Sequence, residues 1–135
     1  MDDAPEILCE RRGAAGLVTL NRPQALNAIT LGMVRDLARA LDAWAQDPAV
    51  TRIVVKAAGG RAFSAGGDIR HLHDLGRAGR FGEALAFWRE EYALNVRIKR
   101  YPKPYVALID GIVMGGGVGV SLHGSHRIAG GRYLF

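Results

Sequence analysis

Two glycine-rich segments are the part of this sequence best suited to chemistry. One is FSAGGDI at residues 63–69, and the other is GIVMGGGVG at residues 111–119. Each follows an apolar run typical of a strand and precedes a helical pattern, so backbone N–H groups are left unpaired at the helix start. Those donors and the positive end of the helix dipole suit a negatively charged oxygen. The pattern predicts a backbone site for an anion or an oxyanion.

The two glycine-rich segments together predict more than either one alone. In a parallel sheet both would lie at the carboxyl ends of strands, where ligands bind. One N–H donor from each can then converge on a single carbonyl oxygen and form an oxyanion hole, which favours chemistry on a thioester or ester carbonyl. The competing interpretation is that the glycines only make turns, and the sequence leaves both open.

Other phosphate or nucleophile motifs fail on spacing. No GxGxxG pattern runs through residues 111–124, and no Lys followed by Ser or Thr completes a P-loop. The segment 119–123 is similar to a nucleophile elbow, but His123 stands where the final glycine belongs. Ser121 is therefore expected to be a small residue for helix packing.

The ionisable side chains do not form a metal-binding pattern. The pairs His71/His73 and His123/His126 have no carboxylate or cysteine at ligand spacing, so no metal site is predicted. Asp68 fits the first turn of a helix, where it complements the dipole.

The elements that must position the two loops follow an α/β order. Strands are expected at residues 6–13, 17–20, 52–57, 105–109 and 126–129, with a hairpin turn at 14–16 and helices at 31–46, at 81–100 and after the glycine triplet. Thr30 is a candidate N-cap. Residues 71–79 are expected to form a polar, mobile loop. The continuous apolar run at 53–55 favours a sheet that is covered on both faces.

The helix at residues 81–100 carries one apolar stripe. Positions spaced at 100° place five residues on it, namely Phe81, Leu85, Trp88, Tyr92 and Val96. Glu90 falls opposite the stripe and is expected to be solvated, whereas Glu91 and Asn95 fall at its flank. A carboxylate beside an apolar surface costs free energy unless it is paired. Glu91 therefore either pairs with an arginine, such as Arg97 or Arg127, or lines a pocket.

Bulk properties limit the class of protein. The 135 residues correspond to one domain at most, 49% are hydrophobic, and the net charge is +5 without basic runs interleaved with aromatics. Nucleic acid is therefore not an expected partner. Asp110 and the glycines argue against a membrane span at residues 106–122. The single Cys9 fits a reducing compartment, and the first residues do not form a signal peptide, so a cytoplasmic location is expected.

Three blocks, LVTLNRPQALNAIT, FSAGGDI and YVALIDGIVMGGGVG, resemble the crotonase (enoyl-CoA hydratase/isomerase) superfamily. The resemblance implies a spiral of ββα units and a coenzyme A thioester as substrate, with no separate cofactor. It also implies an oxyanion hole made by the backbone N–H groups of Gly67 and Gly116. Coenzyme A would then lie along Ala25, Leu26, Ala65, Gly67, Asp68 and Ile69.

Within that superfamily the chain is similar to the branch that hydrolyses 3-hydroxyisobutyryl-CoA in valine breakdown. Hydratases carry a catalytic glutamate two residues after the glycine triplet, where this sequence has Gly119. The resemblance implies that Glu91 contacts the substrate and that the reaction is thioester hydrolysis. The alternatives are an enoyl-CoA hydratase or isomerase and a non-catalytic acyl-CoA-binding fragment.

The resemblance also implies that residues 1–135 are the N-terminal portion of such a domain. The acid/base carboxylates and the C-terminal helices of the family would lie beyond residue 135. A full-length protein of this type is expected to form a homo-oligomer, with an acyl-CoA as its ligand and no membrane partner.

Overall fold

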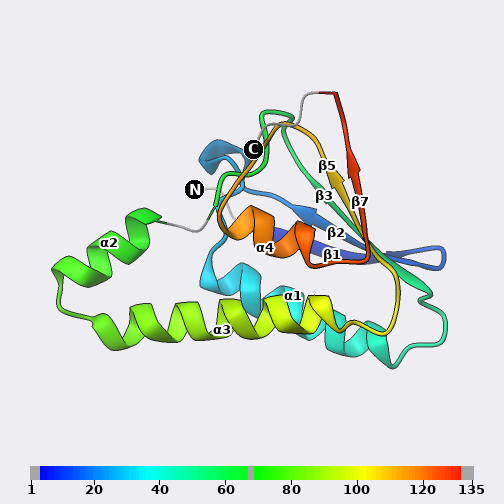
Figure 1. Cartoon of the computed structure of the whole chain (residues 1–135), viewed down its shortest axis with the longest axis horizontal. Helices are drawn as coiled ribbons and strands as arrows, with labels where there is room; N and C mark the ends of the chain where they lie inside the picture. Colours follow the sequence, from blue (N-terminus) through cyan, green and yellow to red (C-terminus); the bar gives the residue numbers. More distant parts are fainter. Residues whose placement is uncertain (1–3, 67–68, 132–135) are drawn as a thin grey trace.

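The structure, a computed structural model, describes residues 4–66 and 69–131 and has an α/β architecture (Figure 1). Its main sheet has the strand order β1-β2-β3-β5-β7. The bounds are β1 Ile7–Arg12, β2 Ala15–Leu20, β3 Arg52–Ala57, β5 Tyr105–Ile109 and β7 His126–Ala129. Strand β1 is antiparallel to β2, and all other neighbours are parallel. The predicted fold class and these five strands are confirmed.

A second, two-stranded parallel sheet joins the two glycine-rich segments. It pairs β4 Ala62–Ser64 with β6 Ile112–Val113. Neither strand is predicted from the sequence, because two or three residues carry too little alternation to be recognised. The pairing brings the two segments side by side, as the parallel-sheet argument requires.

In the described part of the chain, four α-helices and one short 3-10 helix connect the strands. They are η1 Pro23–Ala25, α1 Leu31–Ala45, α2 Ile69–Arg77, α3 Phe81–Lys99 and α4 Gly116–Leu122. Thr30 is the N-cap of α1, and its hydroxyl oxygen accepts a hydrogen bond of 3.2 Å from Met33 N–H. The loop expected at residues 71–79 is wrong, because α2 continues to Arg77. Its polar composition hid the helical spacing of Leu72 and Leu75.

Helices α1, α3 and α4 lie on one side of the main sheet (Figure 1). The core contains alternate residues of β2, β3 and β5, including Val18, Ile53 and Tyr105, packed with Leu37 and Leu41 of α1. Within the described residues, the expectation of a sheet covered on both faces is wrong. Strand β3 alternates between buried and more open positions, and β7 is exposed along its length.

Helix α3 differs from its predicted orientation. The five residues of the apolar stripe, Phe81, Leu85, Trp88, Tyr92 and Val96, are between 44% and 68% exposed. The helix instead buries Ala84, Phe87, Leu94 and Ile98. Glu90 is solvent-accessible, as expected, and both of its carboxylate oxygens also accept hydrogen bonds of 2.9 Å from Arg35 of α1. The apolar stripe contains the larger side chains and therefore gave the stronger helical pattern in the sequence. The residues that the helix actually buries form a second apolar set.

Candidate functional site

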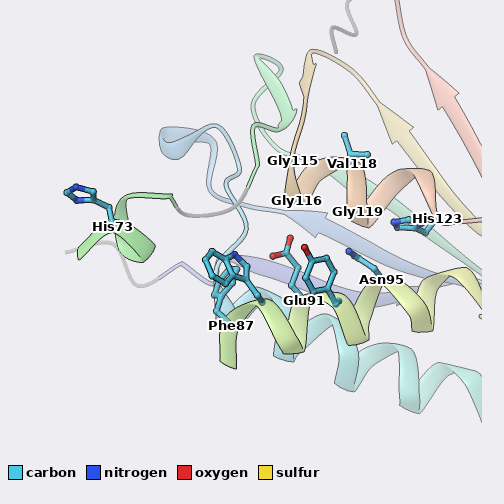
Figure 2. Close-up of a pocket in the computed structure, with 11 residues that line it drawn as sticks. His73, Phe87, Glu91, Asn95, Gly115, Gly116, Val118, Gly119 and His123 are labelled. Carbon is cyan, nitrogen blue, oxygen red and sulfur yellow. The ribbon is translucent and has the colours of Figure 1, made fainter. Parts of the chain in front are cut away.

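A cavity of about 630 Å³ lies between α3 and α4 (Figure 2). Its volume is in the usual range for small-molecule sites. Helix α3 contributes Phe87, Trp88, Glu91, Tyr92 and Asn95, and the start and end of α4 contribute Gly115, Gly116, Val118, Gly119 and His123. His73 of α2 completes the lining. The cavity therefore has one wall of mostly small residues and one wall of large side chains.

The glycine triplet is packed directly against the other glycine-rich segment. A Cβ atom on Gly117 would lie 2.4 Å from the carbonyl oxygen of Ser64, so only glycine fits there. The same Ser64 oxygen accepts a hydrogen bond of 3.1 Å from Met114 N–H. Ser64 also donates through its hydroxyl group to the Asn27 carbonyl at 2.8 Å. These contacts fix the start of α4 relative to strand β4.

Gly116 is the first residue of α4 and lies in the cavity wall. Within residues 4–66 and 69–131 its N–H group donates to no acceptor, as expected for the first turn of a helix. The FSAGGDI segment passes close by, since a Cβ on Gly66 would lie 3.9 Å from Gly116 N. Gly67 and Asp68, the next two residues, lie outside the described residues. The second donor of the expected oxyanion hole therefore stays a prediction.

Among the described residues expected to hold coenzyme A, Ala25, Leu26 and Ala65 lie close together but are not part of the lining of this cavity. Ala65 N–H donates to the Leu26 carbonyl at 3.0 Å, and Ile29 N–H donates to the Gly66 carbonyl at 2.7 Å. Ala25 belongs to η1, and Ile69 begins α2. The structure thus brings residues 25–26 beside residue 65, at the edge of the glycine-rich segments.

Asn27 organises this edge and was missed in the sequence analysis. It is 1% exposed and has φ of 55°, the left-handed region that asparagine tolerates better than most residues. Its amide donates to the carbonyls of Ala58 and Ala62 at 2.9 and 3.0 Å and accepts from Arg22 N–H at 2.7 Å. A polar residue inside the apolar run ALNAI was the signal that could have revealed it.

Glu91 projects from α3 toward the start of α4 (Figure 2). Of the two open interpretations, the structure supports a lining residue. Arg97 pairs with Asp42, and Arg127 donates to the carbonyls of Leu122 and Gly124. Burial raises the pKa of the Glu91 carboxyl above its ordinary value of 4.5. A partly buried carboxyl group therefore faces the unpaired N–H of Gly116 across the cavity.

Asn95 lies one helical turn after Glu91 and also lines the cavity. Its Oδ1 atom is buried and has no hydrogen-bond partner in the described part of the chain. The carboxamide packs against Gly119, where an added Cβ would lie 2.7 Å from Oδ1. The helical spacing predicts that Asn95 lies beside Glu91, but it indicates no role for the side chain.

Two buried hydroxyl groups donate hydrogen bonds to carbonyl groups of α4, one from strand β5 and one from α4 itself. The Tyr105 hydroxyl group donates to the Val120 carbonyl at 2.7 Å, and Tyr105 is 0% exposed. Ser121 is also 0% exposed, and its hydroxyl group donates to the Gly117 carbonyl at 2.7 Å. The expectation that Ser121 is a packing residue is confirmed.

The described residues contain neither a metal-binding cluster nor a helix that could cross a membrane. Within them, no group of three or more His, Cys, Asp or Glu side chains is arranged to hold a metal ion. In the same residues, every helix is too short or too polar to cross a membrane.

Comparison with known proteins gives close relatives over almost the whole chain. The 3-hydroxyisobutyryl-CoA hydrolase of Xenopus tropicalis is 54% identical over 96% of this chain, and that of Homo sapiens is 51% identical over 99%. The chain spans only 34% of the length of either relative. Both are named as mitochondrial proteins, so the expectation of a cytoplasmic location is wrong. A free cysteine indicates a reducing environment, and that does not identify one compartment.

Solved structures agree on the fold. An enoyl-CoA hydratase from Rhodobacter sphaeroides superposes with a TM-score of 0.93 at 47% identity, covering 96% of this chain and 38% of that one. A carnitinyl-CoA dehydratase from Mycobacterium thermoresistibile gives 0.87 at 47% identity, covering 93% and 37%.

The family comparison covers most of the sequence. The family model described as enoyl-CoA hydratase/isomerase matches residues 15–135, which includes both glycine-rich segments and the whole cavity. The resemblance seen in the three sequence blocks is thereby confirmed. The chain belongs to the enoyl-CoA hydratase/isomerase family.

Proposed function

We propose that the protein carrying this chain hydrolyses a short-chain acyl-CoA thioester, with 3-hydroxyisobutyryl-CoA as the substrate. The observation that carries this proposal is Gly119. Family hydratases have a catalytic glutamate at this position, whereas here the side chain is absent and the Asn95 carboxamide fills the adjacent space. Relatives 51–54% identical are named as hydrolases of that substrate.

The proposed reaction uses the α4 wall to stabilise charge. The thioester carbonyl oxygen would accept a hydrogen bond from Gly116 N–H and a second one from Gly67 N–H. Water adds to the carbonyl carbon, the oxygen gains negative charge, and the carbon–sulfur bond then breaks to give the free acid and the coenzyme A thiol. One such donor is typically worth about 10²–10³ in rate, because it acts in a preorganised site. The N–H of Gly116 lies at the cavity wall and has no acceptor within the described residues, which supports this assignment.

Glu91 is proposed to contact the acyl group or the thioester from the α3 wall. Its raised pKa suits a carboxyl group that exchanges a proton or donates a hydrogen bond. The carboxylates that activate water in this branch of the family are expected beyond residue 135. Coenzyme A would extend past Gly66 along Ala25, Leu26, Ala65, Asp68 and Ile69, where the backbone bonds between the two segments support a continuous binding edge.

The test uses the protein made from the complete reading frame and compares its activity on two substrates. 3-Hydroxyisobutyryl-CoA and crotonyl-CoA are each incubated with the enzyme, and both free thiol and loss of the enoyl double bond are measured. Release of thiol from the first substrate, without hydration of the second, is expected. Hydration of crotonyl-CoA without thiol release from 3-hydroxyisobutyryl-CoA would contradict the proposal.

Hydration of an enoyl-CoA is the second candidate. It is favoured by the structural match to a protein named as an enoyl-CoA hydratase, at a TM-score of 0.93. It would require a base other than residue 119 to face the cavity. Glu91 is the carboxyl group of the described residues that lies in the lining, so Glu91→Gln would abolish hydration if this candidate were correct.

A non-catalytic role in acyl-CoA binding is the third candidate. Calorimetry with coenzyme A, run beside the thiol assay, separates it from the others. Binding without turnover by the protein from the complete reading frame would favour this candidate over hydrolysis.

A further inference from the structure

Asn95 carries an unmet hydrogen-bonding requirement inside the cavity. Its Oδ1 atom is buried and unpartnered in the described part of the chain, although the residue is one of those lining the cavity. A buried acceptor without a donor has lost its hydration without gaining a hydrogen bond in return, which is unfavourable. The group is one turn from Glu91 on the same helix and faces α4 (Figure 2). A ligand that donates a hydrogen bond to Oδ1 would remove this unfavourable contribution.

We propose that Asn95 is a specificity-determining residue whose carboxamide hydrogen-bonds the hydroxyl group of the acyl chain. This inference rests on the proposed function and identifies the part of the substrate that the α3 wall recognises. A carboxamide offers both an acceptor and donors, and a hydroxyl group can serve either of them. Rotation of the carboxamide exchanges Oδ1 and Nδ2, so either atom can face the ligand.

The position of Asn95 relative to Gly116 matches a 3-hydroxyacyl group. Asn95 packs against Gly119, which lies three residues further along α4 than Gly116, or about 4.5 Å at the rise of an α-helix. A hydroxyl oxygen on C3 is three bonds from the thioester carbonyl carbon, which is a comparable span. With the carbonyl at Gly116 and coenzyme A leading away past Gly66, the acyl chain points toward Asn95.

Gly119 is the partner that makes room for this interaction. A Cβ at position 119 would lie 2.7 Å from Oδ1 and 3.0 Å from Nδ2 of Asn95, so any side chain there displaces the carboxamide. Gly119→Ala therefore provides a second way to remove the interaction without touching Asn95. The atoms that must move are the far end of a side chain, so the fold should tolerate the change.

The experiment is calorimetric binding of non-hydrolysable ester analogues of 3-hydroxyisobutyryl-CoA and of isobutyryl-CoA, which lacks the hydroxyl group. In both analogues a methylene group replaces the thioester sulfur, so that the carbonyl is kept and the protein cannot cleave the ligand. The proteins are wild type, Asn95→Leu, Gly119→Ala and, as a control, Arg89→Leu, an exposed position on α3 away from the cavity. Wild type and the control are expected to bind the hydroxylated ester about tenfold more tightly. In Asn95→Leu and Gly119→Ala the ratio of the two dissociation constants should fall to about one.

Three results would overturn the inference while leaving the proposed function standing. One is a wild-type ratio that persists in Asn95→Leu. Another is an equal loss of affinity for both esters in that variant, which indicates a structural role or a bound water. A lower melting temperature for Asn95→Leu would also count against it, because removing an unpaired acceptor should not destabilise the fold. If wild type binds neither ester more tightly than free coenzyme A, the proposed function itself fails, and this inference fails with it.

Discussion

The two walls of the cavity are built in opposite ways. The α4 wall presents mainly backbone: Gly116 and Gly119 have no side chain, and Gly117 is pressed against the Ser64 carbonyl. The α3 wall presents side chains, with Glu91 and Asn95 facing inward between exposed aromatic residues. Because packing holds the backbone of the α4 wall in place, its N–H groups can point at one fixed position. The chemistry of the α3 wall, in contrast, changes whenever one of its side chains is substituted. This contrast suggests that α4 determines where charge is stabilised and that α3 determines which acyl group is accepted.

The largest expected effect comes from removing a donor of the α4 wall. Gly116→Pro deletes one N–H group, and proline is well tolerated at the first position of a helix. Turnover of 3-hydroxyisobutyryl-CoA by the protein from the complete reading frame should fall at least about 10²-fold. Steady-state kinetics measures the loss, and circular dichroism checks that the helix content is retained. Activity within twofold of wild type would show that the oxyanion is bound elsewhere.

The next effect tests how tightly the α4 wall is packed. Gly117→Ala places a Cβ atom 2.4 Å from the Ser64 carbonyl oxygen, and backbone must move to accommodate it. The free energy of unfolding should fall by about 2 kcal/mol. Gly119→Ala is the matched control, since the atoms nearest to its Cβ belong to the end of the Asn95 side chain and not to backbone. Its stability should stay within about 1 kcal/mol of wild type. Denaturant titration of both variants provides the comparison, and equal effects would contradict the packing described here.

A smaller effect is expected behind the α4 wall. Tyr105→Phe leaves the buried carbonyl of Val120 without the hydroxyl donor that now lies 2.7 Å away. The free energy of unfolding should fall by about 1–2 kcal/mol, because the Val120 carbonyl stays buried away from water without a hydrogen-bond donor. Chemical denaturation measures it. An unchanged free energy of unfolding would mean that Tyr105 does not anchor α4.

The smallest effect concerns Glu91 on the α3 wall. Burial raises its pKa above 4.5, so the folded protein disfavours the ionised carboxylate and loses stability as the pH rises through 4.5 to the folded pKa. Glu91→Gln should therefore be slightly more stable than wild type at about pH 7. The difference should vanish below the ordinary pKa of 4.5. Thermal unfolding across this pH range checks the sign, and a variant less stable at neutral pH would contradict it.

The sequence predicted the main sheet and the placement of the glycine-rich segments at strand ends. Those features follow from local patterns: the apolar run at 105–109, the Thr30 cap and the triplet that starts α4 are all visible in neighbouring residues. The pairing of β4 with β6 was missed because each strand is too short to show alternation. The contact that matters there, Gly117 against Ser64, joins residues far apart in the chain.

The orientation of α3 shows the limit of periodicity. The aromatic stripe and the set that includes Phe87, Leu94 and Ile98 are both apolar, and only tertiary packing decides which faces the core. The same ambiguity concealed Asn95, whose importance depends on the absence of a side chain at Gly119 across the cavity. Glu91, in contrast, could be identified from the sequence. A carboxylate beside an apolar surface costs free energy in any orientation of the helix, so it needs a partner or a pocket.

The most direct test of the central claim is carbon-13 NMR of isobutyryl-CoA labelled at the thioester carbonyl. When the ester binds the wild-type protein, hydrogen bonds from backbone N–H groups should shift the carbonyl resonance downfield from its position in free solution. The Gly116→Pro variant should bind the ester and give a clearly smaller shift. An equal shift in both proteins would contradict the assignment of Gly116 N–H to the thioester oxygen.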